Sequence, residues 1–476
     1  MLFSTIPFLY YFLPCVLILY FLSPRCLKNT VLLISSLVFY GWGEPKYVFL
    51  MMLSILIGYI SGILIEKFRD NKLSKIIFVI GVVISLSFLA YYKYMDFFIE
   101  NFNKLTGMSI ASLRIALPIG ISFYTFQLVS YIIDVYRGTT VAQKNIINLA
   151  AYITMFPQLI AGPIVRYTDI ELQLRTRKHT IEKFSLGIRR FIIGLGKKIL
   201  IADLLNNICT QYREVSEISV LFAWMYGIAF ALQLYFDFSG YSDMAIGLGH
   251  IFGFDFLENF EHPYVSRSIK EFWRRWHISL GSWFRDYVYI PLGGSRVSKA
   301  RWFFNIFVVW FLTGFWHGAD WTFIVWGLMF AVLLVVEKLW IGSFLEKSRV
   351  VSHVYVPFFT MISFILFNAS NTPAVAEGAS AFSVAWRDII SLFGVGGIPL
   401  VTDETLYYLR SYAVVYILAF IGATPVVKNV INSIKKTGYG EKIINVAEPV
   451  VMISLLVIIT AFIVDSTFSP FLYFRF

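Results

Sequence analysis

A histidine and an aspartate lie three residues apart in one of the most apolar stretches of this sequence. They are His317 and Asp320, within GFWHGADW at residues 314–321, where Phe, Trp, Val and Leu dominate on both sides. This spacing could support two kinds of chemistry: proton transfer by an imidazole whose tautomer the carboxylate sets, or ligation of a metal ion by both side chains. Because no third metal ligand lies nearby in the sequence, we do not expect a metal site.

The position of His317 along its apolar stretch makes it a candidate functional residue. A helix that begins near Arg301 and rises about 1.5 Å per residue would place His317 roughly 20 Å further on, well inside a bilayer. The alternative is a histidine that only bonds to a neighbouring carbonyl group, which would be the better interpretation in a soluble protein. In a membrane, an ionisable residue at depth is a functional hypothesis by default.

The densest polar region, residues 255–301, mixes Trp, Phe and Tyr with Arg, Asp and His. Aromatic residues together with Arg mark the boundary between water and lipid, so we expect an interfacial amphipathic helix on the cytoplasmic side. That interpretation does not explain His277, which lies between a Trp and the apolar Ile278. Three tryptophans of the region follow helical spacing: Trp273, Trp276 and Trp283.

Two further motifs carry polar groups. PLGGSR, residues 291–296, could form an anion site from backbone N–H groups, but we favour a tight turn. Polar side chains also interrupt the apolar run at residues 232–249, which indicates a water-filled cavity or hydrogen bonds between helices. These side chains are Asp237, Ser239, Tyr241 and Asp243.

The elements that must position these residues are membrane helices. The chain has 476 residues, of which 58% are hydrophobic and 14% charged, with a mean hydropathy of +0.71. Soluble domains are about half apolar and about a quarter charged, and a helical span needs roughly 20 apolar residues. We therefore expect an all-α polytopic membrane protein with about 11–12 transmembrane helices plus re-entrant and interfacial helices.

The candidate spans follow from the apolar runs. The first run lacks a basic leader and a cleavage site, so we expect a retained span rather than a signal peptide. Residues 145–163 contain Pro157 and Gly162-Pro163, which break helices and favour a re-entrant element. The predicted spans are 6–22, 30–42, 47–65, 76–94, 115–135, 187–206, 219–238, 303–316, 321–337, 351–369, 411–427 and 447–464.

The distribution of charge predicts how the chain crosses the membrane. The net charge of +11 comes from loops rich in Lys and Arg, which face the cytoplasm in membrane proteins, so no nucleic-acid partner is needed to explain it. The loop 370–410 and both termini are then external. The three cysteines are scattered, without metal-binding or redox spacing. The segments predicted to be cytoplasmic are 66–75, 164–186, 262–302, 338–349 and 428–442.

Five long stretches, in order, resemble the membrane-bound O-acyltransferase family, and within it the bacterial group that O-acetylates alginate and peptidoglycan. The final FSPFLYFRF is also similar to that group. The five stretches are LPIGISFYTFQLVSYIIDVYRG, FPQLIAGPIVRY, LQLYFDFSGYSDMAIGLGHIFGFDFLENFEHPY, FWRRWHISLGSWFRDYVYIPLGG and FLTGFWHGADWTFIVWG.

The resemblance implies one integral-membrane domain over residues 1–476, built as a funnel of helices with a tunnel through a thin central layer. Within it we expect N-terminal helices at 1–110, a catalytic core at 111–340 and C-terminal helices at 341–476. His317 matches the catalytic histidine of the family. His277 matches the second histidine, which faces the tunnel from the cytoplasmic side.

The family passes an acyl group from a cytoplasmic thioester to a hydroxyl group outside. A hydroxyl is a poor nucleophile at neutral pH, so we predict that neutral His317 acts as its base and that His277 orients or polarises the thioester. Acetyl-CoA is the expected donor, without a bound cofactor. We expect supporting roles around the tunnel for Asp320, Trp316, Trp276, Asp237, Ser239 and Tyr241. The donor-binding candidates are Arg274, Arg275 and Arg285.

The resemblance also implies a setting and partners. We expect a multi-pass protein of the bacterial cytoplasmic membrane, in contact with lipid, that serves a polysaccharide or peptidoglycan acceptor together with an extracytoplasmic partner of the SGNH hydrolase type. D-alanyl transfer to teichoic acid is an alternative with the same chemistry. A transporter of lipid-linked sugars and a scaffold of a secretion complex are alternatives of other classes.

Overall fold

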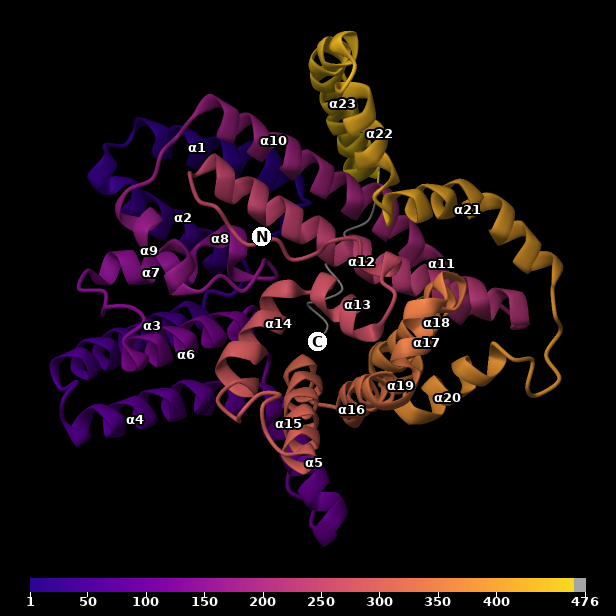
Figure 1. The fold of residues 1–476 in the computed structure, drawn as a ribbon, viewed down its shortest axis with the longest axis horizontal. Helices are drawn as coiled ribbons and strands as arrows, with labels where there is room; N and C mark the ends of the chain where they lie inside the picture. The colour runs from indigo at the N-terminus through magenta and orange to yellow at the C-terminus, as the bar shows by residue number, and fades with distance from the viewer. Residues whose placement is uncertain (466–476) are drawn as a thin grey trace. The chain divides into compact units, whose positions relative to one another are not determined.

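Helices are the regular secondary structure of the part that this computed structural model describes, residues 1–465 (Figure 1). No strand occurs among those residues, which confirms the predicted all-α class. The motif FSPFLYFRF, residues 468–476, lies outside the described residues.

The chain packs as two compact units. The first consists of Met1–Phe191 and Ser242–Leu257, and the second of Ile192–Tyr241 and the residues from Glu258 onward. The long helix α12, Val220–Ile251, contributes its first part to the second unit and its last part to the first. The catalytic, supporting and donor-binding residues predicted from the sequence belong to the second unit, whereas Asp243 of the predicted polar cluster belongs to the first.

The first unit is built from the N-terminal helices. Its segment 145–163 breaks at Met155, whose φ of −48° and ψ of 106° leave the helical region just before Pro157. This confirms that the segment is not one continuous helix. The helices are α1 (Leu13–Leu22, preceded by a π-helical turn at Pro7–Phe12), α2 (Lys28–Gly43), α3 (Tyr47–Lys67), α4 (Lys72–Leu89), α5 (Met95–Thr106), α6 (Ile121–Arg137), α7 (Ile146–Thr154), α8 (Phe156–Leu159), α9 (Tyr167–Arg175) and most of α10 (Ile181–Gly196).

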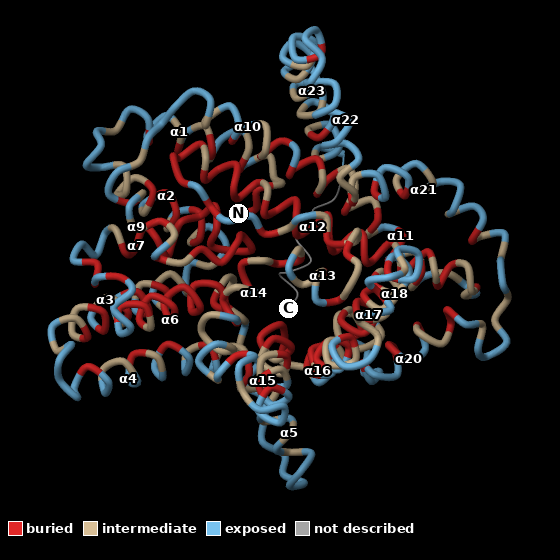
Figure 2. Tube along the Cα trace, viewed as in Figure 1, coloured by how far each residue is buried: buried red, intermediate tan, exposed pale blue. Residues whose placement is uncertain are grey.

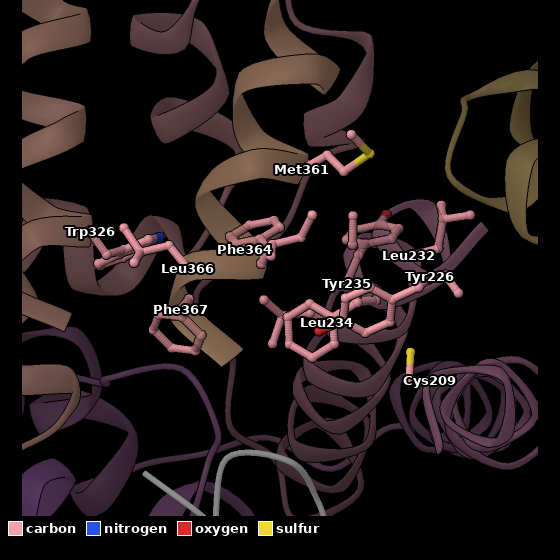
Figure 3. Packing of buried hydrophobic residues seen from close by; sticks show 14 of the residues in the cluster. Cys209, Tyr226, Leu232, Leu234, Tyr235, Trp326, Met361, Phe364, Leu366 and Phe367 are labelled. Carbon is pink, nitrogen blue, oxygen red and sulfur yellow. The ribbon is translucent and has the colours of Figure 1, made fainter. Parts of the chain in front are cut away.

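The second unit holds the remaining helices. An apolar core joins α12, α16 and α18 in it, and Figure 3 shows part of this core, including Tyr235, Trp326, Phe364 and Phe367. Besides α12, the helices are α11 (Asp203–Glu214), α13 (Ile269–Arg275), α14 (Ile278–Phe284), α15 (Lys299–His317), α16 (Trp321–Val336), α17 (Gly342–Lys347), α18 (Arg349–Asn368), α19 (Pro373–Ala376), α20 (Ala381–Ser391), α21 (Asp403–Gly422), α22 (Val426–Lys435) and α23 (Gly438–Asp465).

Seven helical stretches of the described chain are long and apolar enough to cross a membrane. The other predicted spans also form helices, but α2, α6 and α10 are shorter and α15 has a polar start. The run Pro7–Leu22 is apolar but short. The seven stretches are Tyr47–Lys67, Lys72–Thr106, Val220–Ile251, Trp321–Lys347, Arg349–Ala376, Asp403–Gly422 and Gly438–Asp465.

The helices differ in how much of their apolar stretch is buried inside the protein. Only 6% of the apolar stretch of α23 is buried, whereas 78% of the stretch in α12 is buried. Figure 2 shows α22 and α23 largely exposed and most of α12 buried. Soluble proteins rarely expose apolar surface of this extent, so the exposed faces are those expected to contact lipid.

Residues 255–301 do not form the single interfacial helix predicted from the tryptophan spacing. α13 ends at Arg275, and His277 has φ 46° and ψ 53°, a left-handed conformation that a helix cannot contain, before α14 begins. Trp276 and Trp283 are buried rather than interfacial. At the end of the region, PLGGSR forms the predicted turn, with positive φ angles at Gly293 and Gly294.

Candidate active site

His317 is the last residue of α15, which packs closely against α16. A Cβ atom on Gly314 would lie 2.3 Å from the carbonyl oxygen of Phe323, and one on Gly327 would lie 2.3 Å from that of Trp310. Because neither contact is possible for a larger residue without movement, the two glycines allow the backbones of α15 and α16 to approach. The close packing of α15 against α16 therefore fixes the position of His317, at the end of α15.

Aromatic rings surround the imidazole of His317, which is only 6% exposed. Its ring centroid lies 4.9 Å from that of Trp326 and 5.3 Å from that of Phe367, both nearly perpendicular to it. Figure 3 shows these two rings close together in the core. The C-terminal end of a helix carries partial negative charge, so the end of α15 would stabilise the imidazolium that forms if His317 accepts a proton.

Asp320 has a different partner from the one the sequence predicts. Its carboxylate accepts hydrogen bonds from the backbone N–H and the hydroxyl of Thr322, at 2.8 and 2.7 Å. This is the geometry of a residue that caps the N-terminus of α16. Asp320 therefore positions His317 through the turn between the two helices rather than by holding the imidazole.

His277 lies in the break between α13 and α14 and is 2% exposed. Its Nδ1 atom lies 3.1 Å from Oδ1 of Asn259, and its ring packs edge to face on Phe238, with centroids 4.6 Å apart. Its Nε2 atom is buried without a hydrogen-bond partner among the described residues. Burial lowers the pKa of His277 to about 3, because desolvation disfavours the charged ring.

Trp316 lies between the two histidines. The centroid of its indole is 6.3 Å from that of His277 and 5.0 Å from that of His317, its neighbour in the chain. Trp316 is itself buried. The structure thus brings together three residues that the sequence singled out.

A cavity of about 420 Å³ adjoins this group, and His277 forms part of its wall. Its basic lining residues Lys270, Arg274 and Arg285 are exposed, whereas His277 is buried. The cavity therefore connects a basic surface with a buried imidazole. The other residues that contribute to its wall include Trp273, Tyr289, Trp310 and Thr313.

Two residues predicted at the site lie elsewhere. Arg275 is not part of the cavity wall, because its guanidinium forms an ion pair of 2.9 Å with Glu271 one helical turn away. Trp276 packs into the core against Phe272 and Phe364, with ring centroids 5.4 and 5.1 Å away. Arg275 therefore stabilises α13, and Trp276 supports the site from the core.

The two aspartates of the polar cluster in α12, Asp237 and Asp243, form ion pairs. Lys198, buried in a π-helical turn at Lys197–Ala202, places Nζ 2.8 Å from a carboxylate oxygen of Asp237. Its Nζ is also 2.8 Å from Asp203. Ser239 and Tyr241, which also belong to α12, are buried as well. This unit therefore uses Asp237 for an ion pair within the bundle, one of the two outcomes that the sequence left open.

The last residue of the predicted cluster belongs to the first unit. There Asp243 lies 2.9 Å from Arg190, and the two side chains form an ion pair. The predicted polar cluster is therefore divided between two independent ion pairs.

Three further candidates were not predicted from the sequence: Asn259, Lys198 and Glu337. The carboxylate of Glu337 accepts hydrogen bonds from the backbone N–H groups of Ile269 and Lys270, which anchors the start of α13. The sequence signal for Lys198 and Glu337 was a charge within an apolar run. Asn259 gave no such signal, because its role depends on contacts that the fold creates.

The described residues contain no group of three or more His, Cys, Asp or Glu side chains that could hold a metal ion.

Comparison with known proteins supports an enzymatic site. The sequence profile of the membrane-bound O-acyltransferase (MBOAT) family matches residues 141–371, which include both histidines. The chain is 42% identical over 403 residues to the probable alginate O-acetylase AlgI of Azotobacter vinelandii, covering 83% of this chain and 79% of the relative. It is 33% identical over 438 residues to a peptidoglycan O-acetyltransferase of Helicobacter pylori, covering 84% and 81%.

A third relative is similar over a smaller region. A teichoic acid D-alanyltransferase of Bacillus subtilis is 32% identical over 228 residues, which is 45% of this chain and 58% of the relative. The similarity to the alginate O-acetylase and to the peptidoglycan O-acetyltransferase extends over most of the chain. The chain belongs to the membrane-bound O-acyltransferase family and is a multi-pass membrane O-acyltransferase.

Proposed function

We propose that this enzyme transfers an acetyl group from acetyl-CoA in the cytoplasm to a hydroxyl group of a cell-surface polysaccharide or of peptidoglycan. One observation supports the assignment most strongly: two buried histidines flank a single indole, and one of them forms the inner wall of a basic cavity. A donor that carries phosphates at one end and a reactive thioester at the other matches a cavity with these two ends.

The basic end of the cavity suits the phosphates of coenzyme A. Lys270, Arg274 and Arg285 lie around the cavity, and Arg in particular binds phosphate oxygens through paired N–H donors. A volume of about 420 Å³ is typical of small-molecule sites and accommodates only part of so long a donor. We therefore assign the phosphates to the exposed end and the thioester to the end at His277.

The transfer step assigns the base to His317. The hydroxyl oxygen attacks the carbonyl carbon of the thioester, and the imidazole of His317 accepts the hydroxyl proton. The tetrahedral intermediate then collapses, the C–S bond breaks, and the thiolate receives the proton. An ester and a free thiol result. The indole N–H groups of Trp316 and Trp326 are nearby donors that could stabilise the oxyanion.

The names of two relatives support the proposed setting and acceptor. Two proteins similar over most of the chain are named for alginate and peptidoglycan O-acetylation, which points to an extracytoplasmic polymer and to the cytoplasmic membrane of a bacterium. We assign completion of the transfer to a separate extracytoplasmic protein of the SGNH hydrolase type. The D-alanyltransferase relative covers less than half of this chain, so D-alanyl transfer is the second candidate.

The experiment that tests this assignment compares ester-linked groups on the cell surface with and without the gene. Mild alkali releases acetate and D-alanine from purified surface polymers, and both can be quantified. Loss of ester-linked acetate on deletion, restored by the wild-type gene, is the expected result. Loss of D-alanine instead, or no change in either ester, would overturn the proposed function.

A further inference from the structure

We propose that Asn259 is a positioning residue for His277: it holds the ring hydrogen on Nδ1, so that Nε2 is a hydrogen-bond acceptor for the reacting molecules. The proposal rests on the proposed function only for the identity of those molecules. Asn259 is fully buried, and its Oδ1 atom lies 3.1 Å from Nδ1 of His277.

The orientation of the Asn259 amide is fixed by a group that can only donate. The backbone N–H of Ser279 lies 3.2 Å from the Oδ1 position of Asn259, and the hydroxyl of Ser279 lies 2.9 Å from it. A backbone N–H requires an acceptor, so the atom at this position is the oxygen rather than the nitrogen of the amide. The same oxygen faces Nδ1 of His277, which must therefore carry the hydrogen.

The backbone holds this arrangement in place. The carbonyl oxygen of Asn259 accepts a hydrogen bond of 3.0 Å from the N–H of Ile278, and the N–H of Glu261 donates to the carbonyl of Arg275 at 2.9 Å. These contacts fasten the segment around Asn259 to both sides of His277. The left-handed conformation of His277, which is uncommon for a residue with a side chain, is thereby maintained.

The surroundings of His277 keep its ring neutral. The charged groups that line the cavity are Lys270 and Arg274 on α13 and Arg285 after α14, whose guanidinium forms an ion pair of 2.6 Å with Asp286; Tyr289 is also titratable. The side chains that face the ring from α12, α15 and the loop before α13 are uncharged: Phe238, Trp316 and Phe260. Burial of the ring disfavours the imidazolium, because desolvation penalises the charged form. A neutral ring with hydrogen on Nδ1 has a lone pair on Nε2.

This tautomer restricts the part that His277 can play. A bare Nε2 cannot donate a hydrogen bond to the thioester carbonyl, so His277 does not polarise that carbonyl. Instead it accepts a hydrogen bond from an N–H or O–H group, such as an amide of the donor or the attacking hydroxyl. In this proposal His277 keeps the orienting role predicted from the sequence, but it does not polarise the thioester carbonyl.

Nitrogen NMR of the full-length protein in lipid tests the tautomer directly. The chain has six histidines, so protein labelled with ¹⁵N-histidine gives few signals, and those of His277 are assigned by their loss in His277→Gln. We expect a protonated Nδ1 and an unprotonated Nε2 at neutral pH. A protonated Nε2 would overturn the proposal. This measurement needs no substrate, so it stands apart from any failure of the proposed function.

The Asn259→Asp variant tests whether the contact matters for transfer. A carboxylate keeps the acceptor for Nδ1 and for Ser279, but it favours the imidazolium, by about 1–3 pH units when a charge lies this close. We expect the acid limb of the pH–rate profile to move to higher pH, and the His277 nitrogen signals to move toward those of imidazolium. The same substitution in a His277→Gln background should cause no such shift. An unchanged profile and unchanged signals in folded Asn259→Asp protein would show a structural role only.

Discussion

The indole of Trp316 lies with its ring centroid 6.3 Å from the imidazole of His277, while His317, the next residue in the chain, lies on the side facing Trp326. His277 borders a basic cavity, whereas His317 is not among the residues that line it. The two histidines are therefore in different environments although one ring connects them. This arrangement is suited to His277 acting on the donor and His317 acting on the acceptor.

Replacing His317 with alanine should abolish transfer. Loss of a general base costs up to roughly 10,000-fold in rate, which is below detection for a slow membrane enzyme. Ester-linked acetate on the cell surface measures the effect, and the thermal unfolding of the detergent-solubilised protein should stay near that of the wild type. His353→Ala is the matched control, because His353 is exposed on α18. Wild-type acetylation in His317→Ala cells would show that the base is another residue.

Replacing His277 with alanine should reduce transfer without abolishing it. An orienting group contributes less than the base, and we expect a loss on the order of 100-fold in purified protein supplied with acetyl-CoA and an acceptor. The division of roles would be wrong if His277→Ala were inactive while His317→Ala retained transfer. Equal complete loss in both would indicate that the two histidines act as a unit.

Two adjacent arginines provide a matched test of the donor site. Arg274 belongs to the cavity wall, whereas Arg275 is paired with Glu271. Arg274→Gln should raise the KM for acetyl-CoA roughly fivefold, as expected for about 1 kcal/mol of exposed ionic contact, and should leave kcat nearly unchanged. Arg275→Gln should leave KM unchanged. Equal effects of the two substitutions would argue against a phosphate site at this cavity.

The crossing of α15 and α16 should tolerate no side chain at Gly327. A methyl group there overlaps the backbone of Trp310, and overpacking of this kind costs typically about 1–3 kcal/mol. Gly327→Ala should lower the midpoint of thermal unfolding and reduce transfer, because His317 lies at the end of α15. Gly438→Ala is the control, since nothing lies within 4 Å of its added Cβ. An unchanged midpoint in Gly327→Ala would contradict the packing argument.

The topology predicted from the charge distribution can be tested by cysteine labelling. Asp403 and Lys436 are both exposed, at the start of α21 and just after α22. In a protein without Cys15, Cys26 and Cys209, an impermeant maleimide added to intact cells should label a cysteine at position 403 and not one at position 436. Labelling at position 436 and not at position 403 would show that the predicted topology is inverted.

The apolar runs predicted most helices well, since burial in lipid or protein requires the backbone to bond within each segment. α3 and α16 begin at the expected residues, 47 and 321, and end within two residues of the predicted ends. The break at His277 was not predictable, because the tryptophan spacing that suggests one helix is local. The contact with Asn259 that holds His277 in the left-handed region comes from a separate segment.

The candidate site shows the same limit. The two histidines could be selected from sequence because they are ionisable residues in apolar surroundings. Asp320 was expected to hold the imidazole, whereas the structure shows that it caps the N-terminus of α16. The meeting of His277 with Trp316, and the pairing of Lys198 with Asp237, join segments distant in the chain and follow only from the packed structure.

The most direct test of the central claim is transfer across a sealed membrane. Inside-out vesicles that contain the enzyme and the extracytoplasmic partner, with acceptor polymer enclosed, receive acetyl-CoA labelled in the acetyl group on their outer, cytoplasmic face. We predict alkali-labile label on the enclosed polymer, one free thiol released per ester formed, and neither product with His317→Ala. Label that remains on acetyl-CoA with the wild-type enzyme, or equal transfer by wild-type and His317→Ala protein, would contradict the account.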